Sequence, residues 1–127
     1  TQLKALLESQ WRGKGARPHF LQPSSSLTYA WRDGATAGTR VIEQSIAIGG
    51  QRWRPEATYR VTANSYLAAG GAGFFVFLDG AERSGGPLDV DALAQYLTQQ
   101  SAEQPLKVET MPRIVRRSGA GTSLPVR

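Results

Sequence analysis

The sequence of 127 residues contains no cysteine and only one histidine, His19. Without cysteine the chain can form no disulfide, no thiolate zinc site and no cysteine nucleophile. A single histidine argues against a histidine-based metal cluster or a Ser-His-Asp triad, and we interpret His19, which follows Pro18, as a loop residue. No apolar run approaches the roughly 20 residues that cross a bilayer, so we expect no membrane partner. No signal peptide is visible.

Acidic residues are also scarce, with 10 Asp and Glu against 15 Lys and Arg, which gives a net charge of +5. The carboxylates form no pair with an obvious acid–base spacing, so we expect no hydrolytic centre in this chain. Basic residues gather near the end of the sequence, and we interpret residues 119–127 as a flexible, solvated basic tail. The alternative is a basic patch that attracts phosphates or nucleic acid.

A hydrophobic content of 40% and a charged content of 20% are typical of a folded domain, and the length suits one domain. Hydrophobic periodicity predicts two helices and several strands. The helices are expected at 1–11 and 89–100, and the strands at 27–31, 40–48, 51–53 and 59–64. We therefore predict an α+β fold with two layers, in which helices pack on one face of a mainly antiparallel or mixed sheet.

Several local features refine this prediction. Gly49-Gly50 suits a two-residue hairpin turn. In the strand 40–48, Ile42, Ile46 and Ile48 are expected to share one face. In the helix 89–100, Asp89 is the expected N-cap, and a buried stripe is predicted for Val90, Leu93, Ala94 and Leu97. The apolar run 74–78 fits either a buried strand or a packed loop, and Val108 and Ile114 suggest a further edge strand.

The most informative stretch runs from Tyr59 to Phe74, where a strand pattern leads directly into the glycines 70, 71 and 73. Such a loop can hold a phosphate on backbone N–H groups, but it lacks the Lys-Ser/Thr ending of a P-loop, and a tight structural turn is the alternative. Tyr66 could stack on a nucleobase or lie in the core. Asn64 could read a base edge, although its chemistry favours capping the following turn.

Tryptophan and arginine also occur together in Trp31-Arg32 and in Arg52-Trp53-Arg54. Such clusters can form a nucleic-acid-binding face, but arginine packing on an aromatic ring is common on ordinary surfaces. The favoured interpretation is ordinary packing. A single-strand nucleic-acid binder that uses Trp31, Trp53 and Tyr59 is the less favoured function, and its binding would depend strongly on salt.

The stretch Tyr59–Phe74 resembles the signature of the C-terminal domain of 5'-nucleotidases, a family that includes UDP-sugar hydrolases and 2',3'-cyclic phosphodiesterases. Residues 2–8, 21–29, 38–41 and 88–97 resemble other segments of that domain. Two positions depart from the family pattern. Tyr66 stands where the family has Phe, and Ala72 stands where it has Asp.

The resemblance implies that residues 1–118 are part of a substrate-binding domain, truncated at the N-terminus, which contains no catalytic residue and holds no metal. In the family, a separate N-terminal catalytic domain holds two divalent metal ions, and the C-terminal domain grips the nucleoside between two aromatic rings. The expected partners are a nucleoside or nucleotide-like molecule and that catalytic domain, and a homodimer is a further expectation. The implied location of the parent protein is periplasmic or extracellular.

Carried onto this sequence, the resemblance assigns a substrate-binding role to eight residues: Ser25, Asn64, Tyr66, Gly70, Gly71, Ala72, Gly73 and Phe74. Tyr66 takes the position of one stacking aromatic. Ala72 takes the position of the Asp that holds the ribose, and a methyl group accepts no hydrogen bond. The expected function is substrate binding within a 5'-nucleotidase-like phosphoester hydrolase of nucleotide catabolism. The alternative is a non-catalytic interaction module that has lost nucleoside recognition.

Overall fold

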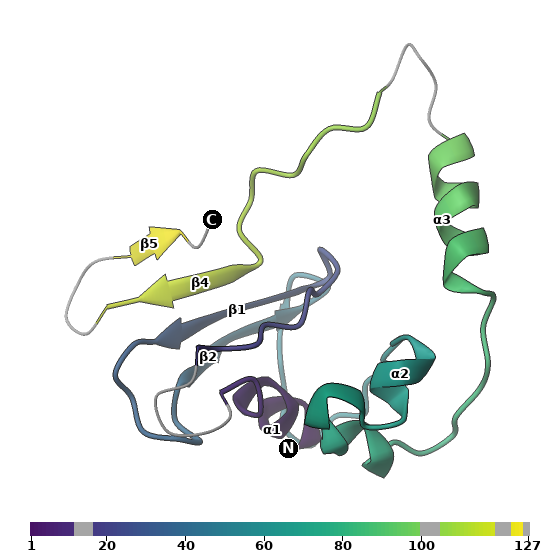
Figure 1. Cartoon of the computed structure of the whole chain (residues 1–127). Coiled ribbons are helices and arrows are strands. Elements are labelled where there is room, and N and C mark those ends of the chain that lie inside the picture. The colour runs from purple at the N-terminus through teal and green to yellow at the C-terminus, as the bar shows by residue number, and fades with distance from the viewer. Residues whose placement is uncertain (12–16, 100–104, 119–122, 126–127) are drawn as a thin grey trace.

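A computed structural model describes residues 1–11, 17–99, 105–118 and 123–125. Its centre is a five-stranded sheet in the order β3-β2-β1-β4-β5 (Figure 1). The strands are β1 (Leu27–Arg32), β2 (Val41–Ile48), β3 (Gln51–Arg52), β4 (Ile114–Arg117) and β5 (Ser123–Pro125). β1 and β4 are parallel and the other neighbours are antiparallel, so the predicted α+β class and mixed sheet are confirmed.

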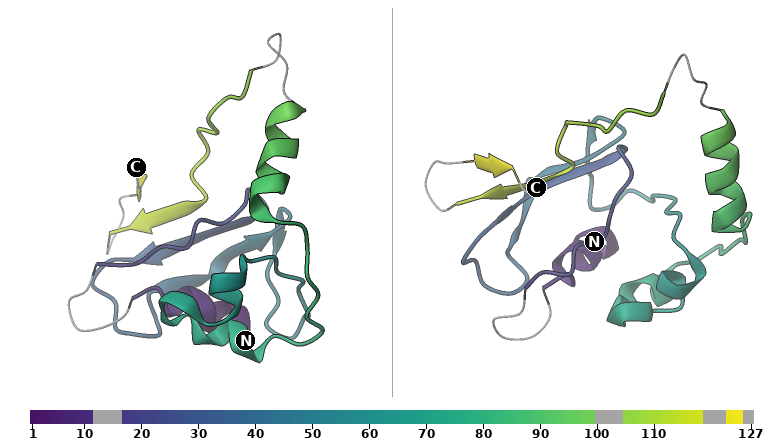
Figure 2. Two further views of the ribbon diagram at one scale, coloured as in Figure 1. Left: turned by 45° about the vertical axis from the view of Figure 1, so that its right-hand side comes forward. Right: turned by 45° about the horizontal axis from the view of Figure 1, so that its top comes forward.

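The helical elements lie in three parts of the chain. The helices are α1 (Gln2–Glu8), α2 (Ser65–Ala68) and α3 (Asp89–Thr98), and two short 3-10 turns follow α2, η1 (Gly71–Gly73) and η2 (Phe75–Asp79). α1 covers one face of the sheet, and α2, η1 and η2 lie beside it (Figures 1 and 2). The Nε2 atom of Gln2 in α1 donates to the carbonyl of Asp79 in η2 at 3.3 Å. α1 therefore links the sheet to the segment that contains the glycines.

The predicted hairpin between β2 and β3 is confirmed. Gly49 and Gly50 both have positive φ angles, 57° and 77°, as a mirror-image two-residue turn requires. The turn sets the register in which Ile48 faces Gln51 and Ala47 faces Arg52.

A bulge in β2 changes which residues of that strand are buried. The pairing with β1 shifts between Thr28 and Ala30, and the Ser45 hydroxyl accepts from the Ala30 backbone N–H at 2.8 Å in place of a ladder carbonyl. The shift places Val41, rather than Ile42, in the buried cluster with Ile46. The prediction that Ile42 shares the face of Ile46 was therefore wrong, because strict alternation ends at a bulge.

The core lies between α1 and the sheet. Leu7 of α1 packs with four buried side chains of β1, β2 and the residue after β3, namely Tyr29, Val41, Ile46 and Trp53. Buried Gln10 satisfies its amide inside this layer, because its Nε2 donates to the Leu7 carbonyl and the Tyr29 hydroxyl, each at 2.8 Å, and its Oε1 accepts from Leu21 N–H at 2.8 Å.

The predicted strand at 59–64 is absent, although its alternating pattern is clear. These residues connect Trp53 to α2 without joining the sheet. Tyr59 instead turns back, and its hydroxyl accepts from Arg54 N–H at 2.8 Å. An alternating sequence favours an extended backbone, but a strand also needs a neighbouring strand with which to exchange hydrogen bonds.

The helix predicted at 89–100 forms as α3, but its predicted buried stripe is wrong. All four residues of the stripe are exposed, namely Val90, Leu93, Ala94 and Leu97. The N-cap position is Leu88 rather than Asp89. Figures 1 and 2 show α3 standing away from the sheet between two long extended connections. The helical period of the sequence correctly predicted a helix. The period could not show whether another part of the molecule would cover the apolar stripe.

The C-terminal part adds the last two strands. Ile114 begins β4, which is an inner strand rather than the predicted edge, while Val108 lies outside the strand with 91% of its surface exposed. Residues 123–125, within the predicted tail, pair with β4 as β5. The other residues of that tail lie outside the described part of the chain.

Candidate functional site

Asn64 is the first residue of the candidate site and lies between the extended segment 59–63 and α2. Its backbone is extended, with φ −67° and ψ 162°, and its side-chain oxygen accepts from Leu67 N–H at 2.8 Å. This is a standard N-cap, so the capping role that its chemistry favoured is confirmed. One acceptor site of the side-chain oxygen is therefore used by α2.

Tyr66 follows in α2 and presents its ring to solvent, with 63% of its surface exposed. Its hydroxyl accepts from the backbone N–H of Ala72 at 2.9 Å, so the side chain spans from α2 to η1. The alternative of a core tyrosine is therefore wrong. The ring is exposed, yet it is held at its tip by the glycine loop, residues 70–73.

Gly71 lies directly against the backbone and the ring of Tyr66. A Cβ placed on Gly71 would lie 2.5 Å from the Tyr66 carbonyl oxygen and 2.7 Å from two ring carbons. Real Cβ atoms do not approach other atoms so closely, and the nearest atom belongs to the backbone. Only glycine at this position lets the loop lie against Tyr66.

The turn itself requires three left-handed residues. Gly70 and Gly73 have φ angles of 81° and 72°, and Ala72 between them has φ 50°. Glycine adopts this region without cost, whereas an alanine there is strained by about 1–2 kcal/mol. The position at which the family has Asp is therefore held by a methyl group on a strained backbone.

Phe74 lies under this loop in the core, with only 1% of its surface exposed. Its ring centre is 5.8 Å from that of His19, which belongs to a loop as expected. Phe74 therefore anchors the glycine loop, and its ring is not available as a stacking surface. The alternatives for residues 74–78 were a buried strand or a packed loop, and the structure has the 3-10 turn η2 instead.

Arg83 is a residue of the site that the sequence did not reveal. One terminal nitrogen of its guanidinium donates to the carbonyls of Ala68 at 2.7 Å and Phe77 at 2.5 Å. Both carbonyls lie near the ends of short helical elements, where a cation is favourable. Arg83 thereby ties α2 to η2, and a single arginine between Glu82 and Ser84 gives no sequence signal of that role.

Ser25 lies elsewhere, in the exposed turn before β1, where the hydroxyls of Ser24 and Ser26 are 2.7 Å apart. The same turn accepts a bond from the β2–β3 hairpin, since Gly49 N–H donates to the Ser26 carbonyl at 2.7 Å. The structure thus brings Asn64, Tyr66 and the glycine loop together and places Ser25 beside the hairpin turn.

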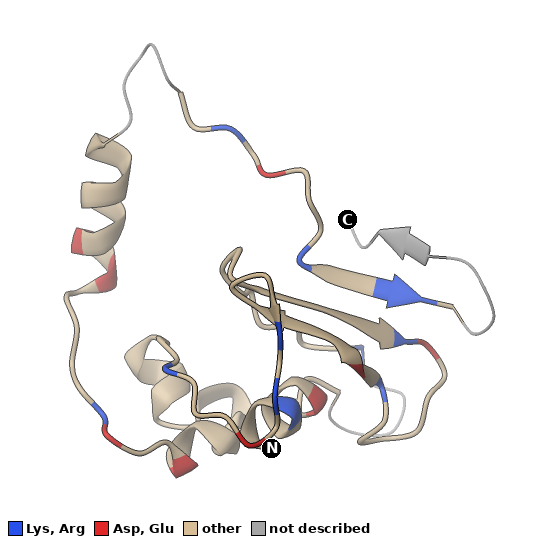
Figure 3. Cartoon of the chain, turned by 180° about the vertical axis from the view of Figure 1, so that it is seen from behind, with Lys and Arg blue, Asp and Glu red and all other residues tan. Residues whose placement is uncertain are grey.

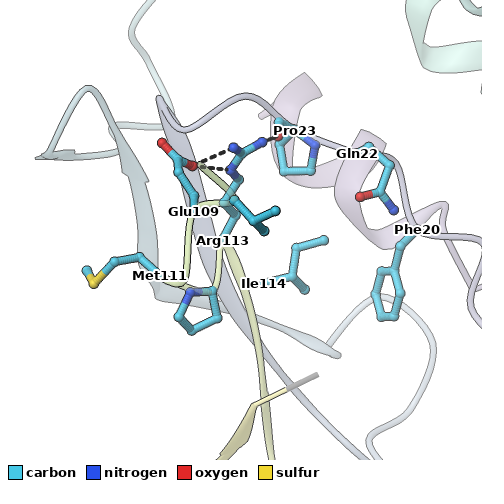
Figure 4. A pocket seen from close by; sticks show the side chains of 9 residues that line it. Phe20, Gln22, Pro23, Glu109, Met111, Arg113 and Ile114 are labelled. Carbon is cyan, nitrogen blue, oxygen red and sulfur yellow. Dashed lines mark hydrogen bonds and ion pairs between the residues drawn. The ribbon is translucent and has the colours of Figure 1, made fainter. Parts of the chain in front are cut away.

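Two pockets formed by described residues lie away from the glycine loop. One of about 340 Å³ is formed by residues 20–23 and 108–114 (Figure 4). The basic side chain in this pocket is Arg113, which pairs with Glu109 at 2.5 Å and donates to the Pro23 carbonyl at 2.7 Å. The other, about 550 Å³, lies beside α1 and contains the Lys4–Glu43 ion pair at 2.9 Å. The candidate site is instead an exposed ring on a loop.

The two tryptophans of the aromatic–basic cluster are in the core, while its arginines, Arg32, Arg52 and Arg54, are exposed. Trp31 and Trp53 are both buried, and the guanidinium of Arg116 lies over the Trp31 ring at 5.6 Å. Arg116 also pairs with Asp33. Because Trp31 and Trp53 are buried, these tryptophans offer no surface on which single-stranded nucleic acid could stack.

Two further features concern metals and membranes. Among the described residues, no group of three or more His, Asp or Glu side chains could hold a metal ion. In the same part of the chain, no helix has both the length and the apolar character needed to span a bilayer.

The fold and site together define a small α+β domain that presents an aromatic ring on a glycine-rich loop. The family model of the 5'-nucleotidase C-terminal domain matches residues 1–79. Since the match covers more than half of the 127 residues, the chain belongs to the 5'-nucleotidase C-terminal domain family. The match ends at the last residue of η2, so residues 88–97 lie outside it. No curated protein and no solved structure matches the chain significantly.

Proposed function

We propose that this chain is the nucleoside- or nucleotide-binding portion of a 5'-nucleotidase-like phosphoester hydrolase of nucleotide catabolism. The proposal places the catalytic domain, with its two divalent metal ions, outside this chain, and the parent protein in the periplasm or outside the cell. Family membership supports the class of domain. The observation that supports a nucleoside or nucleotide as the ligand is the exposed Tyr66 ring, which contacts Gly71 and the Ala72 amide.

Stacking is the interaction that this arrangement offers. A nucleobase on an aromatic side chain gains about 1–3 kcal/mol, and a ring that is already fixed loses little conformational freedom on binding. The Ala72 side chain offers no acceptor for ribose hydroxyls. The isolated chain should therefore bind a nucleoside weakly and carry out no hydrolysis.

The test is a titration of the chain with adenosine, followed by amide NMR. We expect shifts at residues 64–74, and a Tyr66→Ala variant should bind about 5- to 150-fold more weakly, as the loss of 1–3 kcal/mol implies. Tyr66→Phe keeps the stacking ring but loses the hydroxyl that binds the Ala72 amide, so it should bind more tightly than Tyr66→Ala and more weakly than the unsubstituted chain. The matched control is Tyr96→Ala, which removes an exposed tyrosine of α3. Equal binding by Tyr66→Ala and the parent sequence would refute the proposal.

A second candidate function is a non-catalytic interaction module, and the observation that favours it is Ala72 at the family's Asp position. This alternative predicts no adenosine binding by any of these variants. It also predicts that the complete protein, supplied with divalent metal, leaves nucleotides intact. Phosphate release from a nucleotide by the complete protein would exclude it.

A further inference from the structure

The Tyr66 hydroxyl has hydrogen-bonding capacity that the protein does not use. A phenol hydroxyl can donate one hydrogen bond as well as accept. The Tyr66 oxygen accepts from the Ala72 N–H at 2.9 Å, and among the described residues no acceptor takes the hydroxyl proton. The residue is 63% exposed and this hydrogen bond lies at the surface, so a ligand on the ring can reach the hydroxyl.

The glycine loop itself offers a ligand few donors. The N–H groups of Gly70, Gly73 and Phe74 donate to backbone carbonyls at 2.9–3.1 Å, and that of Ala72 donates to Tyr66. A phosphate cradle instead needs several neighbouring N–H groups that point at the anion. The use of these N–H groups within the protein favours the tight structural turn over the phosphate cradle.

The segment that contains the loop is also uncharged. Residues 61–78 include no Lys, Arg, Asp or Glu, and Figure 3 shows α2 and the turns after it in tan as far as Asp79. Arg83 contacts this segment at the carbonyls of Ala68 and Phe77, outside the glycine loop. Stacking and neutral hydrogen bonds are therefore the interactions available at the loop, and they suit the base and the sugar of a nucleoside.

The position of the hydroxyl on the ring determines which part of a nucleoside it can contact. A base that stacks on Tyr66 lies parallel to the ring, and its sugar extends beyond the edge of the base. One side of the ring, at Cδ1 and Cε1, lies against Gly71, and the Cβ end is attached to α2. The sugar is left with the opposite side of the ring or its tip, and the tip carries the hydroxyl.

We propose that the Tyr66 hydroxyl donates a hydrogen bond to a ribose hydroxyl of the bound nucleoside and so selects ligands that carry ribose. The inference rests on the proposed function, because it needs a nucleoside stacked on Tyr66. An oxygen that already accepts a hydrogen bond is a stronger donor, so the Ala72 N–H supports this role. Tyr66 then binds the base with its ring and determines the sugar specificity with its hydroxyl.

The experiment measures the affinities of adenosine and 2',3'-dideoxyadenosine for the chain and for Tyr66→Phe by NMR titration. We expect the chain to bind adenosine about 2- to 10-fold more tightly than the dideoxy ligand, the factor that one hydrogen bond contributes. Tyr66→Phe should bind the two ligands with equal affinity. The matched control is Tyr96→Phe, which removes the hydroxyl of an exposed tyrosine of α3 and should keep the preference for adenosine.

The ratio of the two affinities is the decisive quantity, because a general disturbance of the loop in Tyr66→Phe weakens both ligands alike. A preference for adenosine that persists unchanged in Tyr66→Phe would overturn the inference and leave the proposed function intact. Equal affinity of the unsubstituted chain for both ligands would do the same. A chain that binds neither ligand would overturn the proposed function and this inference together.

Inorganic phosphate, titrated at constant ionic strength, tests whether the loop recognises an anion instead. We expect no saturable amide shifts at residues 70–74, because most of these N–H groups donate within the protein. Saturable shifts there would overturn the assignment of the loop to the sugar.

Discussion

At the residue scale, the two departures from the family pattern contact each other. The hydroxyl that distinguishes Tyr66 from phenylalanine accepts from the N–H of Ala72, the residue that replaces aspartate. With phenylalanine at position 66, this amide would lack that partner. The hydroxyl therefore helps to hold a turn in which Ala72 is left-handed at a cost of about 1–2 kcal/mol.

Restoring the family residue tests whether position 72 can still serve a ribose. Aspartate tolerates the left-handed region better than alanine, so Ala72→Asp should fold at least as stably. We expect adenosine to bind this variant about tenfold more tightly through a charge-assisted hydrogen bond. Binding of 2',3'-dideoxyadenosine, measured in the same NMR titration, should not improve. An equal gain for both ligands would show that the new carboxylate does not contact the ribose.

Tyr29 makes the stability of the core depend on pH in the alkaline range. Burial raises its pKa to about 12, while its hydrogen bond with Gln10 acts in the opposite direction. An unfolded tyrosine ionises near pH 10, so the unfolded state loses its proton first. The contribution of Tyr29 is therefore complete below about pH 10 and is lost as the pH rises towards 12, by up to roughly 2–3 kcal/mol.

This prediction is checked by urea unfolding of the chain and of Tyr29→Phe at several pH values. Below about pH 9 the variant should be less stable by about 0.5–1.5 kcal/mol, the value of one hydrogen bond. Gln10 keeps its bonds to Leu7 and Leu21, so no buried amide is left unpaired. The difference should shrink or reverse as the pH approaches 12, and a constant difference would contradict the raised pKa.

At the scale of elements, α2 is too short to be stable alone and depends on contacts at both ends. It has four residues, begins at the Asn64 cap and ends at the carbonyl of Ala68 that Arg83 binds. Nucleating a single helical turn is unfavourable without such support. The orientation of Tyr66 is thus set by its neighbours rather than by helix propensity.

Gly71→Ala should disturb this arrangement selectively. Its Cβ would meet the backbone oxygen of Tyr66 at 2.5 Å, so the loop or the ring must move, at a cost of about 1–3 kcal/mol. We expect lower stability in urea unfolding and weaker adenosine binding. Gly85→Ala is the control, since a Cβ there meets nothing within 4 Å and its φ is not positive. Equal stability of the two variants would contradict the close approach at Gly71.

At the scale of the whole molecule, the stability of α3 should be lower than that of the sheet. Isolated helices shorter than about 12–15 residues are marginal in water, and α3 has ten residues with an exposed stripe. We therefore expect the amides of α3 to exchange hydrogen rapidly and those of β1 to exchange slowly, as NMR-detected hydrogen exchange would measure. Equally slow exchange of α3 and β1 would contradict this prediction.

The sequence by itself determined the features that depend on neighbours along the chain. The Gly49-Gly50 turn, the Asn64 cap and the period of α3 follow from backbone freedom, a short polar side chain and apolar spacing, and each is present. Family membership also followed from the sequence, because its motif is local.

Only the tertiary structure decided what depends on a partner distant in the sequence. Residues 59–64 have a strand pattern but no neighbouring strand, and α3 has a stripe but no surface beneath it. Tyr66 and Phe74 are both aromatic and close in sequence, yet one is exposed and the other is in the core. The free energies of burial and of strand pairing come from contacts between segments. A pattern within one segment therefore cannot determine whether that segment is buried or paired.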